Sequence, residues 1–245
     1  MHDPGRYGRS FADVYDRWYG DLDPIDEIVS TVTALAPGWD LLELGVGSGR
    51  LAVPLAAAGF AVTGIDASGP MLRLLPDPAD LASSPCQPVL GDMAVLPFAA
   101  ECFDVVLVAY NTLFNLTTVN AQLACLSEAA RCLRPDGRLV IDAFVPADPP
   151  ETRRQMVTRV RSTDDELVLI ATRQDGRSDL VEGAHLQFTA AGMVSRPWSI
   201  LSCGPDELDD RATAAGLQLA ARRATWRGDD FHADSSRHIS VYERL

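Results

Sequence analysis

The segment that decides the fold is LLELGVGSGR, residues 41–50. It joins a short apolar run to an acid, Glu43, and then to three glycines at alternate positions, Gly45, Gly47 and Gly49. Glycines after a buried strand let a ligand approach the backbone closely, and dinucleotides, nucleoside triphosphates and S-adenosylmethionine all bind at such turns. In the dinucleotide pattern GxGxxG the third glycine comes one residue later, and a pyrophosphate would lie poorly beside Glu43. The segment therefore predicts a strand followed by a cofactor-binding loop.

Short apolar strands alternate with helical segments from residue 40 onward. The expected strands are 41–44, 61–65, one ending at residue 90, 103–108 and 138–144, with helices at 51–58, 71–75 and 120–133 and a turn at 134–137. A helix at 205–215 and two strands at 217–226 and 238–243 follow. This alternation predicts an α/β fold with a doubly wound sheet of seven strands, five parallel and a C-terminal antiparallel pair.

Two segments lie outside the alternation. Residues 155–201 alternate β-branched and polar residues between turn signals, which predicts an antiparallel β-insertion after the fifth strand. The first 38 residues read as helices rich in aromatic side chains. The predicted organisation is an N-terminal helical lid (1–38), a cofactor-binding core (39–150), the β-insertion as a substrate cap (151–203), and the last helix and strands of the core (204–245).

The composition excludes several classes of function. The formal net charge is −13 and the sequence pI about 4.6, so the surface repels phosphate backbones and anionic membranes. All 21 basic residues are arginine, which removes a Schiff-base lysine and the lysine of a phosphate-binding P-loop. The five cysteines form no CxxC pair and have no histidine at metal-ligand spacing, so reduced thiols and no metal site are expected. Without a signal pattern or a long apolar run, we expect a cytoplasmic protein with no nucleic-acid or membrane partner.

Three further strand ends carry distinctive residues, and ligands of open α/β sheets bind beyond such ends. Asp66, in the stretch GIDAS, can accept both hydroxyls of a ribose, which indicates a nucleoside but does not separate NAD from S-adenosylmethionine. Asp92 can take the exocyclic amine of an adenine, while Met93 packs against its ring. Residues 108–116 lie at the central strand end, where a substrate would meet the cofactor.

The ordered set ELGVGSGR, GIDAS, GDM and LRPDGRLVI resembles the class I S-adenosylmethionine-dependent methyltransferases over about residues 40–145. The resemblance implies a Rossmann-like fold, S-adenosylmethionine as cofactor and, from FADVYDRWYGDLD and the β-insertion, similarity to glycine and amino-sugar N-methyltransferases. It implies that Glu43 orients the loop and the methionine amino group. The cofactor-binding residues that we expect on this basis are Tyr15, Trp18, Tyr19, Glu43, Gly45, Gly47, Gly49, Arg50, Asp66, Ala67, Ser68, Met71, Asp92, Met93, Tyr110 and Asn111.

Methyl transfer needs the nucleophile aligned with the sulfonium methyl group. An unprotonated amine needs little else, whereas a hydroxyl needs a general base. Tyr15, Asn111 and Asn115 are candidates to hold the acceptor, and His185 is the best candidate base; the similar enzymes often carry a histidine where this chain has Asn115. We expect a methyltransferase that acts on an amine or hydroxyl of a small molecule such as a secondary metabolite. We expect it to work by positioning the acceptor against the cofactor, and to be a monomer or homo-oligomer. An NAD-dependent oxidoreductase and a non-methylating S-adenosylmethionine-binding protein, such as a cyclase or regulator, are the alternatives.

Overall fold

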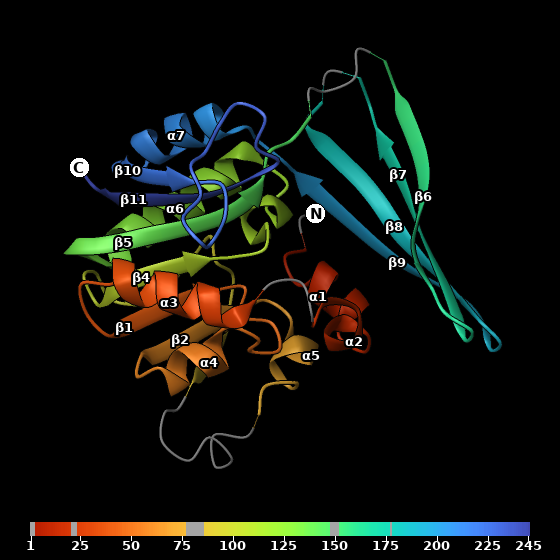
Figure 1. Cartoon of the computed structure of the whole chain (residues 1–245), viewed down its shortest axis with the longest axis horizontal. Coiled ribbons are helices and arrows are strands. Elements are labelled where there is room, and N and C mark those ends of the chain that lie inside the picture. The colour runs from red at the N-terminus through yellow and green to blue at the C-terminus, as the bar shows by residue number, and fades with distance from the viewer. Residues whose placement is uncertain (1–2, 21–23, 77–85, 148–151, 177) are drawn as a thin grey trace.

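The computed structural model describes residues 3–20, 24–76, 86–147, 152–176 and 178–245, and Figure 1 shows their arrangement. A seven-stranded sheet runs in the order β10-β11-β5-β4-β1-β2-β3. Its strands are β1 (Asp40–Leu44), β2 (Ala61–Asp66), β3 (Gln87–Leu90), β4 (Phe103–Val108), β5 (Leu133–Phe144), β10 (Leu217–Arg223) and β11 (Arg237–Arg244). The first five pair in parallel, and β11 pairs antiparallel with both β5 and β10. The predicted fold class is confirmed.

Helices cover both faces of this sheet because neighbouring residues of the central strands are apolar on both sides. Leu41 and Val105 pack with α3 (Ile25–Leu35) and α4 (Ala52–Ala57). Their neighbours Leu42 and Val106 pack on the opposite face, with α6 (Val119–Cys132) and α7 (Pro205–Ala214). Two cores therefore hold the sheet rigid, and its carboxyl edge can present side chains at fixed positions.

The insertion after β5 forms a separate antiparallel sheet with strands in the order β6-β7-β8-β9. These strands are β6 (Arg154–Ser162), β7 (Glu166–Gln174), β8 (Leu180–Thr189) and β9 (Gly192–Leu201). Two short N-terminal helices, α1 (Arg6–Phe11) and α2 (Tyr15–Tyr19), lie between this sheet and α5 (Gly69–Leu72), at the carboxyl edge of the main sheet (Figure 1). Across the described residues, no helix combines the length and the apolar character that crossing a bilayer requires.

Two local predictions were wrong. Residues 134–137, predicted as a turn between α6 and the fifth strand, lie inside β5. On either side of them Leu133 pairs with Phe103 and Arg138 with Val105, so the four residues form a bulge opposite Asp104. The strand predicted at 217–226 ends at Arg223, since Trp226 turns into the core beneath α3. The predicted boundary at residues 150–151 lies outside the described residues.

Candidate cofactor and acceptor site

The loop after β1 requires its three glycines. Gly45, Gly47 and Gly49 have φ angles of 75°, 58° and 84°, a left-handed region in which side chains are strained. A Cβ at Gly45 would also lie 2.4 Å from Cγ2 of Thr112, and one at Gly49 would lie 2.6 Å from a methyl carbon of Leu75. The backbone can therefore approach a ligand on one side while it packs closely on the other.

Asp66 closes this loop from the end of β2. Its Oδ2 accepts the N–H of Gly47 at 3.0 Å, and its Oδ1 accepts the N–H of Ser68 at 2.7 Å. Burial raises the pKa of the Asp66 carboxyl, while both backbone hydrogen bonds lower it. Ser68 is itself buried and caps α5 by accepting the N–H of Met71, so it supports the site without lining it.

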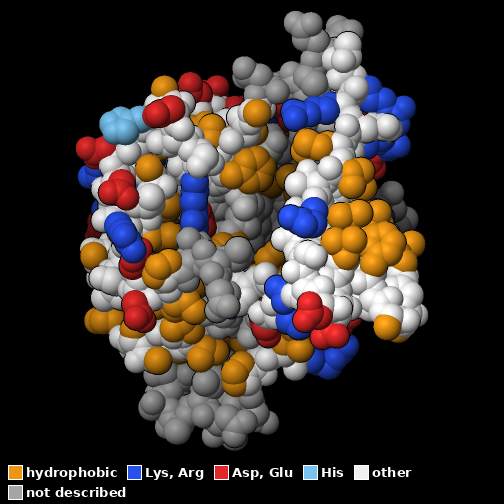
Figure 2. Space-filling model, turned by 45° about the vertical axis from the view of Figure 1, so that its right-hand side comes forward, with side chains coloured by type: hydrophobic (Ala, Val, Ile, Leu, Met, Phe, Trp, Pro, Cys, Tyr) orange, Lys and Arg blue, Asp and Glu red, His pale blue; other side chains and the backbone are white. Residues whose placement is uncertain are grey.

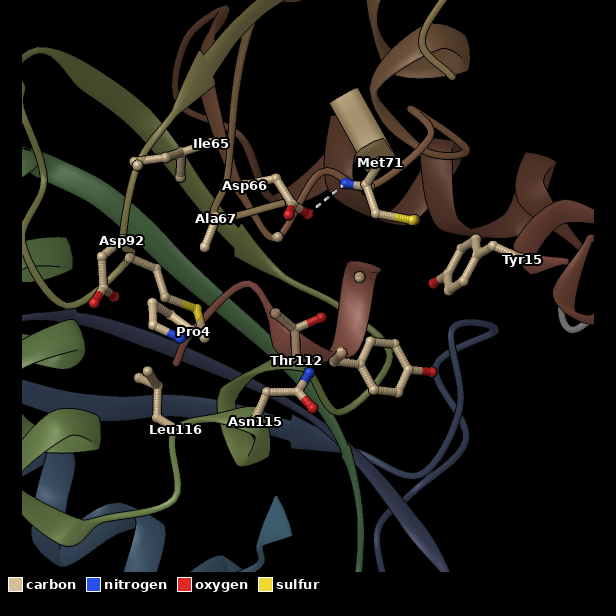
Figure 3. A pocket seen from close by; sticks show the side chains of 16 residues that line it. Pro4, Tyr15, Ile65, Asp66, Ala67, Met71, Asp92, Thr112, Asn115 and Leu116 are labelled. Carbon is tan, nitrogen blue, oxygen red and sulfur yellow. Dashed lines mark hydrogen bonds between the residues drawn. The ribbon is translucent and has the colours of Figure 1, made fainter. Parts of the chain in front are cut away.

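A cavity of about 650 Å³, open to solvent on one side, extends from this loop along the carboxyl edge of the sheet. Figure 3 shows Asp66 and Met71 on one side of it, Asp92 at one end and Tyr15 at the other, with Thr112 and Asn115 opposite. Of the predicted cofactor residues, those that line it are Tyr15, Gly45, Gly47, Asp66, Ala67, Met71, Asp92 and Met93.

A second, smaller cavity lies at the Tyr15 end and holds a buried acid. It is lined by Glu43, Arg50 and Tyr110, together with Tyr15 and Gly45 of the first cavity. Burial raises the pKa of Glu43 to about 8, against the attraction of Arg50, and Oε2 of Glu43 has no hydrogen-bond partner among the described residues. A buried oxygen of this kind needs a ligand donor to offset its desolvation.

The third cavity brings together all four predicted catalytic residues. Tyr15, Asn111, Asn115 and His185 line about 610 Å³ of space. The other lining side chains come from the N-terminal helices, the ends of β4 and β5 and the insertion, and they are Tyr7, Tyr110, Thr112, Phe144, Trp198 and Ile200. Because Tyr15 and Thr112 line all three cavities, the three spaces adjoin one another around these two residues.

The β4 end holds a strained turn in this cavity. Tyr110 and Asn111 have φ angles of 53° and 64°, which cost about 1–2 kcal/mol per residue without glycine. Asp142 holds the turn, since its carboxylate accepts the N–H of Tyr110 and its carbonyl accepts the N–H of Asn111, both at 3.0 Å. Oδ1 of Asn111 accepts the N–H of Phe144 at 2.7 Å. Asn111 is therefore a structural link between β4 and β5 as well as a lining residue.

His185 is fixed as a neutral ring. Nε1–H of Trp198 donates to Nδ1 of His185 at 3.0 Å, so the neutral ring carries its proton on Nε2, which lies 3.2 Å from the Tyr19 hydroxyl. Burial, with the charge of Arg196, lowers the pKa of His185 to about 4. A ring so engaged is a poor proton acceptor, and its contacts fit a positioning role.

The N-terminal helices are held from two sides. Arg196 of β9 pairs with both carboxylate oxygens of Asp13 at 2.6 and 2.8 Å, and Glu166 of β7 accepts from Arg17 at 2.6 Å and from Nε1 of Trp18 at 3.2 Å. On the other side, Arg50 donates to the carbonyl of Tyr19 at 3.1 Å. Trp18 and Tyr19 hydrogen-bond to the insertion and do not line the three cavities, so their contact with cofactor stays a prediction.

Several lining residues escaped the sequence prediction. Tyr7, Pro4, Gly8, Leu116 and Trp198 line the first or third cavity. Among these residues only Gly8 gave a signal in the sequence, because a glycine can mark a close approach of two segments. In the structure a Cβ at Gly8 would lie 2.5 Å from Cβ of Ser68. The others reach the site through tertiary packing, which has no local pattern.

The arrangement suits one cofactor. The glycine loop and Asp66 can accommodate a ribose, and the buried oxygen of Glu43 that has no hydrogen-bond partner among the described residues can accept from an amino-acid end. The residues that line the cavities present no cluster of donors for a pyrophosphate. The fold and site define the class of S-adenosylmethionine-dependent methyltransferases.

Comparison with known proteins identifies the family. The family model described as "Methyltransferase domain" matches residues 41–137. The cypemycin N-terminal methyltransferase of a Streptomyces species is 30% identical over 258 aligned positions that span all of both chains. The solved CcbJ methyltransferase of Streptomyces caelestis superposes with a TM-score of 0.88 and 34% identity over 99% of each chain. The chain belongs to the S-adenosylmethionine-dependent methyltransferases, and its cofactor is S-adenosylmethionine rather than NAD.

A more distant structure shares the fold. The amino pentose methyltransferase CalS10 of Micromonospora echinaspora, solved with S-adenosylmethionine bound, has a TM-score of 0.67 and 22% identity over 95% of this chain and 97% of its own. The predicted enzyme class and cofactor are confirmed.

Proposed function

We propose that this enzyme methylates an amine nitrogen of a small secondary metabolite, and that it does so by positioning the amine rather than by general base catalysis. The observation that carries the proposal is the acceptor cavity: the ten residues that line it include no carboxylate, and its one histidine is engaged through both ring nitrogens. The relative that spans the whole chain is named for methylation at an N-terminus, which agrees with an amine acceptor.

The ionisable groups of the cavity support an amine over a hydroxyl. A hydroxyl acceptor needs a base whose pKa lies near the working pH. The pKa of His185 is about 4, burial raises the pKa of Tyr15 to about 12, and burial raises the pKa of Tyr7 well above its ordinary value. None of these groups takes a proton readily at neutral pH. An amine carries its own lone pair and needs no such help.

Charge in the site selects the reactive form of the amine. The guanidinium of Arg50 lies 3.7 Å from the ring centroid of Tyr110, at the junction of the second and third cavities. A nearby cation and low solvent access both disfavour an ammonium group. The cavity therefore accepts the neutral amine, which is the nucleophile.

We infer the following division of roles for the cofactor. Asp66 would hold the ribose hydroxyls, Asp92 and Met93 the adenine, and Glu43 the methionine amino group, since its free Oε2 lies in the second cavity. When bound, S-adenosylmethionine supplies an electrophilic methyl group for in-line displacement. Tyr15, which lines all three cavities, would separate the bound cofactor from solvent at the point of transfer.

The chain's own residues then do three things for the acceptor. Thr112 and Asn115, which line both the first and third cavities, offer hydrogen bonds that orient the amine toward the cofactor. The aromatic walls limit access of water to the reacting nitrogen. The nitrogen loses its proton to solvent after transfer. The acidic surface supports a small-molecule acceptor over a nucleic acid.

The test is a transfer assay that detects S-adenosylhomocysteine and methylated product with matched pairs of primary amines and alcohols on the same carbon skeleton. We expect the amines to be methylated and the alcohols not, with a rate that rises with pH until the free amine predominates. His185→Gln should shift no pKa in the pH profile. Methylation of the alcohols, with a rate that depends on an enzyme group of pKa near 6 to 7 and is lost in His185→Gln, would contradict the proposal.

A further inference from the structure

The insertion carries a groove that the transfer reaction does not need for a small amine. It has a volume of about 980 Å³ and opens on the lid-facing side of the four-stranded sheet. Figure 2 shows the molecule hollowed between the main body and the insertion. One cross-strand row lines it: Met156 pairs with Thr172, Thr172 with Gly183, and Gly183 with Trp198. Paired residues of antiparallel strands share a face, so this row forms the floor.

The floor is shaped around one indole ring. A Cβ at Gly183 would lie 2.4 Å from Cζ2 of Trp198, so the ring lies directly over this glycine and any side chain there would displace it. The hydrogen bond from Nε1 of Trp198 to His185 holds the ring in the same place. Trp198 is thus a fixed wall, with the acceptor cavity on one side and the groove on the other.

A further cavity adjoins both the groove and the acceptor cavity, and we infer that it joins them. This cavity of about 520 Å³ shares Tyr7, Asn115 and Trp198 with the acceptor cavity, and it shares Arg6, Trp198 and Ser199 with the groove. A molecule whose amine lies beside Asn115 can therefore extend past Trp198 onto the floor of the insertion. The connection would serve no purpose for an acceptor that the inner cavity already encloses.

Charge indicates what extends there. The ionisable residues that line the groove are Arg6, Arg173 and Glu182, and the last two pair with each other. Asp3 forms its ion pair with Arg9, which lowers the pKa of the Asp3 carboxyl, and the charge of Arg6 nearby helps to lower it. The floor beside Arg6 is apolar or weakly polar, with Met156 45% exposed. An apolar surface beside a guanidinium that has no ion-pair partner of its own among the described residues fits an apolar segment that ends in an anion.

We propose that this groove is a binding subsite for the distal part of the methyl acceptor, an apolar segment that carries a carboxylate near Arg6. The proposal rests on the amine-acceptor function above, because it places the amine of the same molecule in the inner cavity. It assigns the insertion a direct role in selecting long, amphiphilic acceptors over short amines.

Three probes test the subsite: hexylamine, 6-phenylhexylamine, and 4-(6-aminohexyl)benzoic acid. Burial of a phenyl ring predicts a rise in kcat/KM of at least about tenfold from the first probe to the second. Pairing with Arg6 predicts a further rise of about fivefold at low salt for the third. Binding of the same probes to the enzyme–S-adenosylhomocysteine complex by calorimetry should follow the same order.

Matched variants locate the effect. Arg6→Gln should remove only the gain from the carboxylate, and Arg227→Gln, at an exposed arginine that pairs with Glu27 and lines none of these cavities, should leave the gain unchanged. Thr172→Phe fills the floor and should remove the gain from the phenyl ring, whereas Ser195→Phe, on the opposite face of β9, should not. Unchanged affinity for S-adenosylhomocysteine confirms that each variant is folded.

The outcomes separate the two proposals. Methylation of all three probes at equal rates, or equal effects of Arg6→Gln and Arg227→Gln, overturns the subsite and leaves the amine-acceptor function standing. Failure of all three amines to bind or react, with methylation of the corresponding alcohols, overturns the function and the subsite with it.

Discussion

Replacement of Asp142 by asparagine should separate what holds the fold from what positions the acceptor. Asp142 is 2% exposed, and its carboxylate accepts three hydrogen bonds: the N–H of Tyr110 at 3.0 Å, and Nε and one terminal nitrogen of Arg237 at 2.6 and 2.7 Å. Asparagine keeps one acceptor oxygen, but its NH2 group replaces the other carboxylate oxygen and cannot accept the hydrogen bonds that this oxygen accepted.

The magnitude follows from these contacts. Loss of one partner of a buried ion pair costs about 3–5 kcal/mol, but the Arg237 side chain is 29% exposed and water can replace part of the lost contact. We therefore expect Asp142→Asn to lower the free energy of unfolding by about 2–3 kcal/mol. The left-handed turn at Tyr110 and Asn111 stores a similar amount of strain, which the carboxylate offsets. Without it the turn relaxes away from the acceptor cavity.

Steady-state kinetics should show the consequence. A displacement of about 1 Å in a positioning group can cost about 100-fold in rate, so kcat/KM for an amine acceptor should fall by about that factor. Affinity for S-adenosylhomocysteine, measured by calorimetry, should change only a few-fold, because Asp66 and Asp92 lie at a different part of the edge.

Asp104→Asn is the matched control. Asp104 also accepts a backbone N–H, from Asp40 at 2.9 Å, and pairs with Arg134 at 2.8 Å, but it lies at the opposite end of β4. It should cost stability, about 1–2 kcal/mol, without a loss of kcat/KM. If both variants reduced catalysis equally, or if Asp142→Asn cost stability alone, the assignment of Asp142 as a positioning residue would be refuted.

Three other predictions concern single groups. The pKa of Glu43 is about 8 without cofactor, so binding of S-adenosylhomocysteine at pH 7 should release a proton, and the affinity should increase as pH rises toward 8. Calorimetry in two buffers should show the proton release, and Glu43→Gln should abolish the release. Gly45→Ala places a Cβ against Thr112 at positive φ and should weaken S-adenosylhomocysteine binding at least tenfold. Gly216→Ala, at φ 83° with open space around the new Cβ, should lower the free energy of unfolding by about 1 kcal/mol and leave S-adenosylhomocysteine binding unchanged. The pKa of His185 is lowered to about 4, so His185 contributes stability that rises with pH between about 4 and 6.5, as the second buried histidine also does. Glu43 acts in the opposite direction above pH 4.5, because its raised pKa lets the folded state bind more protons. The difference in free energy of unfolding between the wild type and His185→Gln, measured in urea across this window, should therefore grow with pH and isolate the histidine.

Residues whose role depends on backbone conformation were predictable from the sequence. The glycines of the loop after β1 take left-handed φ angles, which strain other residues, so the conformation of this loop is reflected in the glycine spacing of the sequence. Asp66 follows a strand end by a fixed spacing, so the parallel topology alone brings it to Gly47. The strands were predictable for a similar reason, because burial on both faces demands unbroken apolar runs such as Phe103–Val108.

Residues whose role depends on docking between distant segments were not predictable. The hydrogen bonds of Trp18 and Tyr19 are an example: Nε1 of Trp18 bonds to Glu166 and the Tyr19 hydroxyl to His185, which lie 148 and 166 residues away in sequence. Trp198 carried no local signal, since its place depends on Gly183 beneath it and His185 beside it. The segment 134–137 has the composition of a turn, yet pairing of β5 with β4 on both sides of it keeps it inside the strand as a bulge.

Tyr19 links the loop after β1 to the wall of the acceptor cavity. Its carbonyl accepts from Arg50 and its hydroxyl meets Nε2 of His185, whose Nδ1 accepts from Trp198. Arg50 lines the cavity in which we propose that the methionine end binds, and Trp198 lines both the acceptor cavity and the groove. A cofactor that moved Arg50 would therefore act on Tyr19 and, through it, on His185, so we expect the affinities for cofactor and acceptor to be coupled through this residue. Because the N-terminal helices lie across the edge of the sheet where we propose that the cofactor binds, we expect the cofactor to bind before the acceptor.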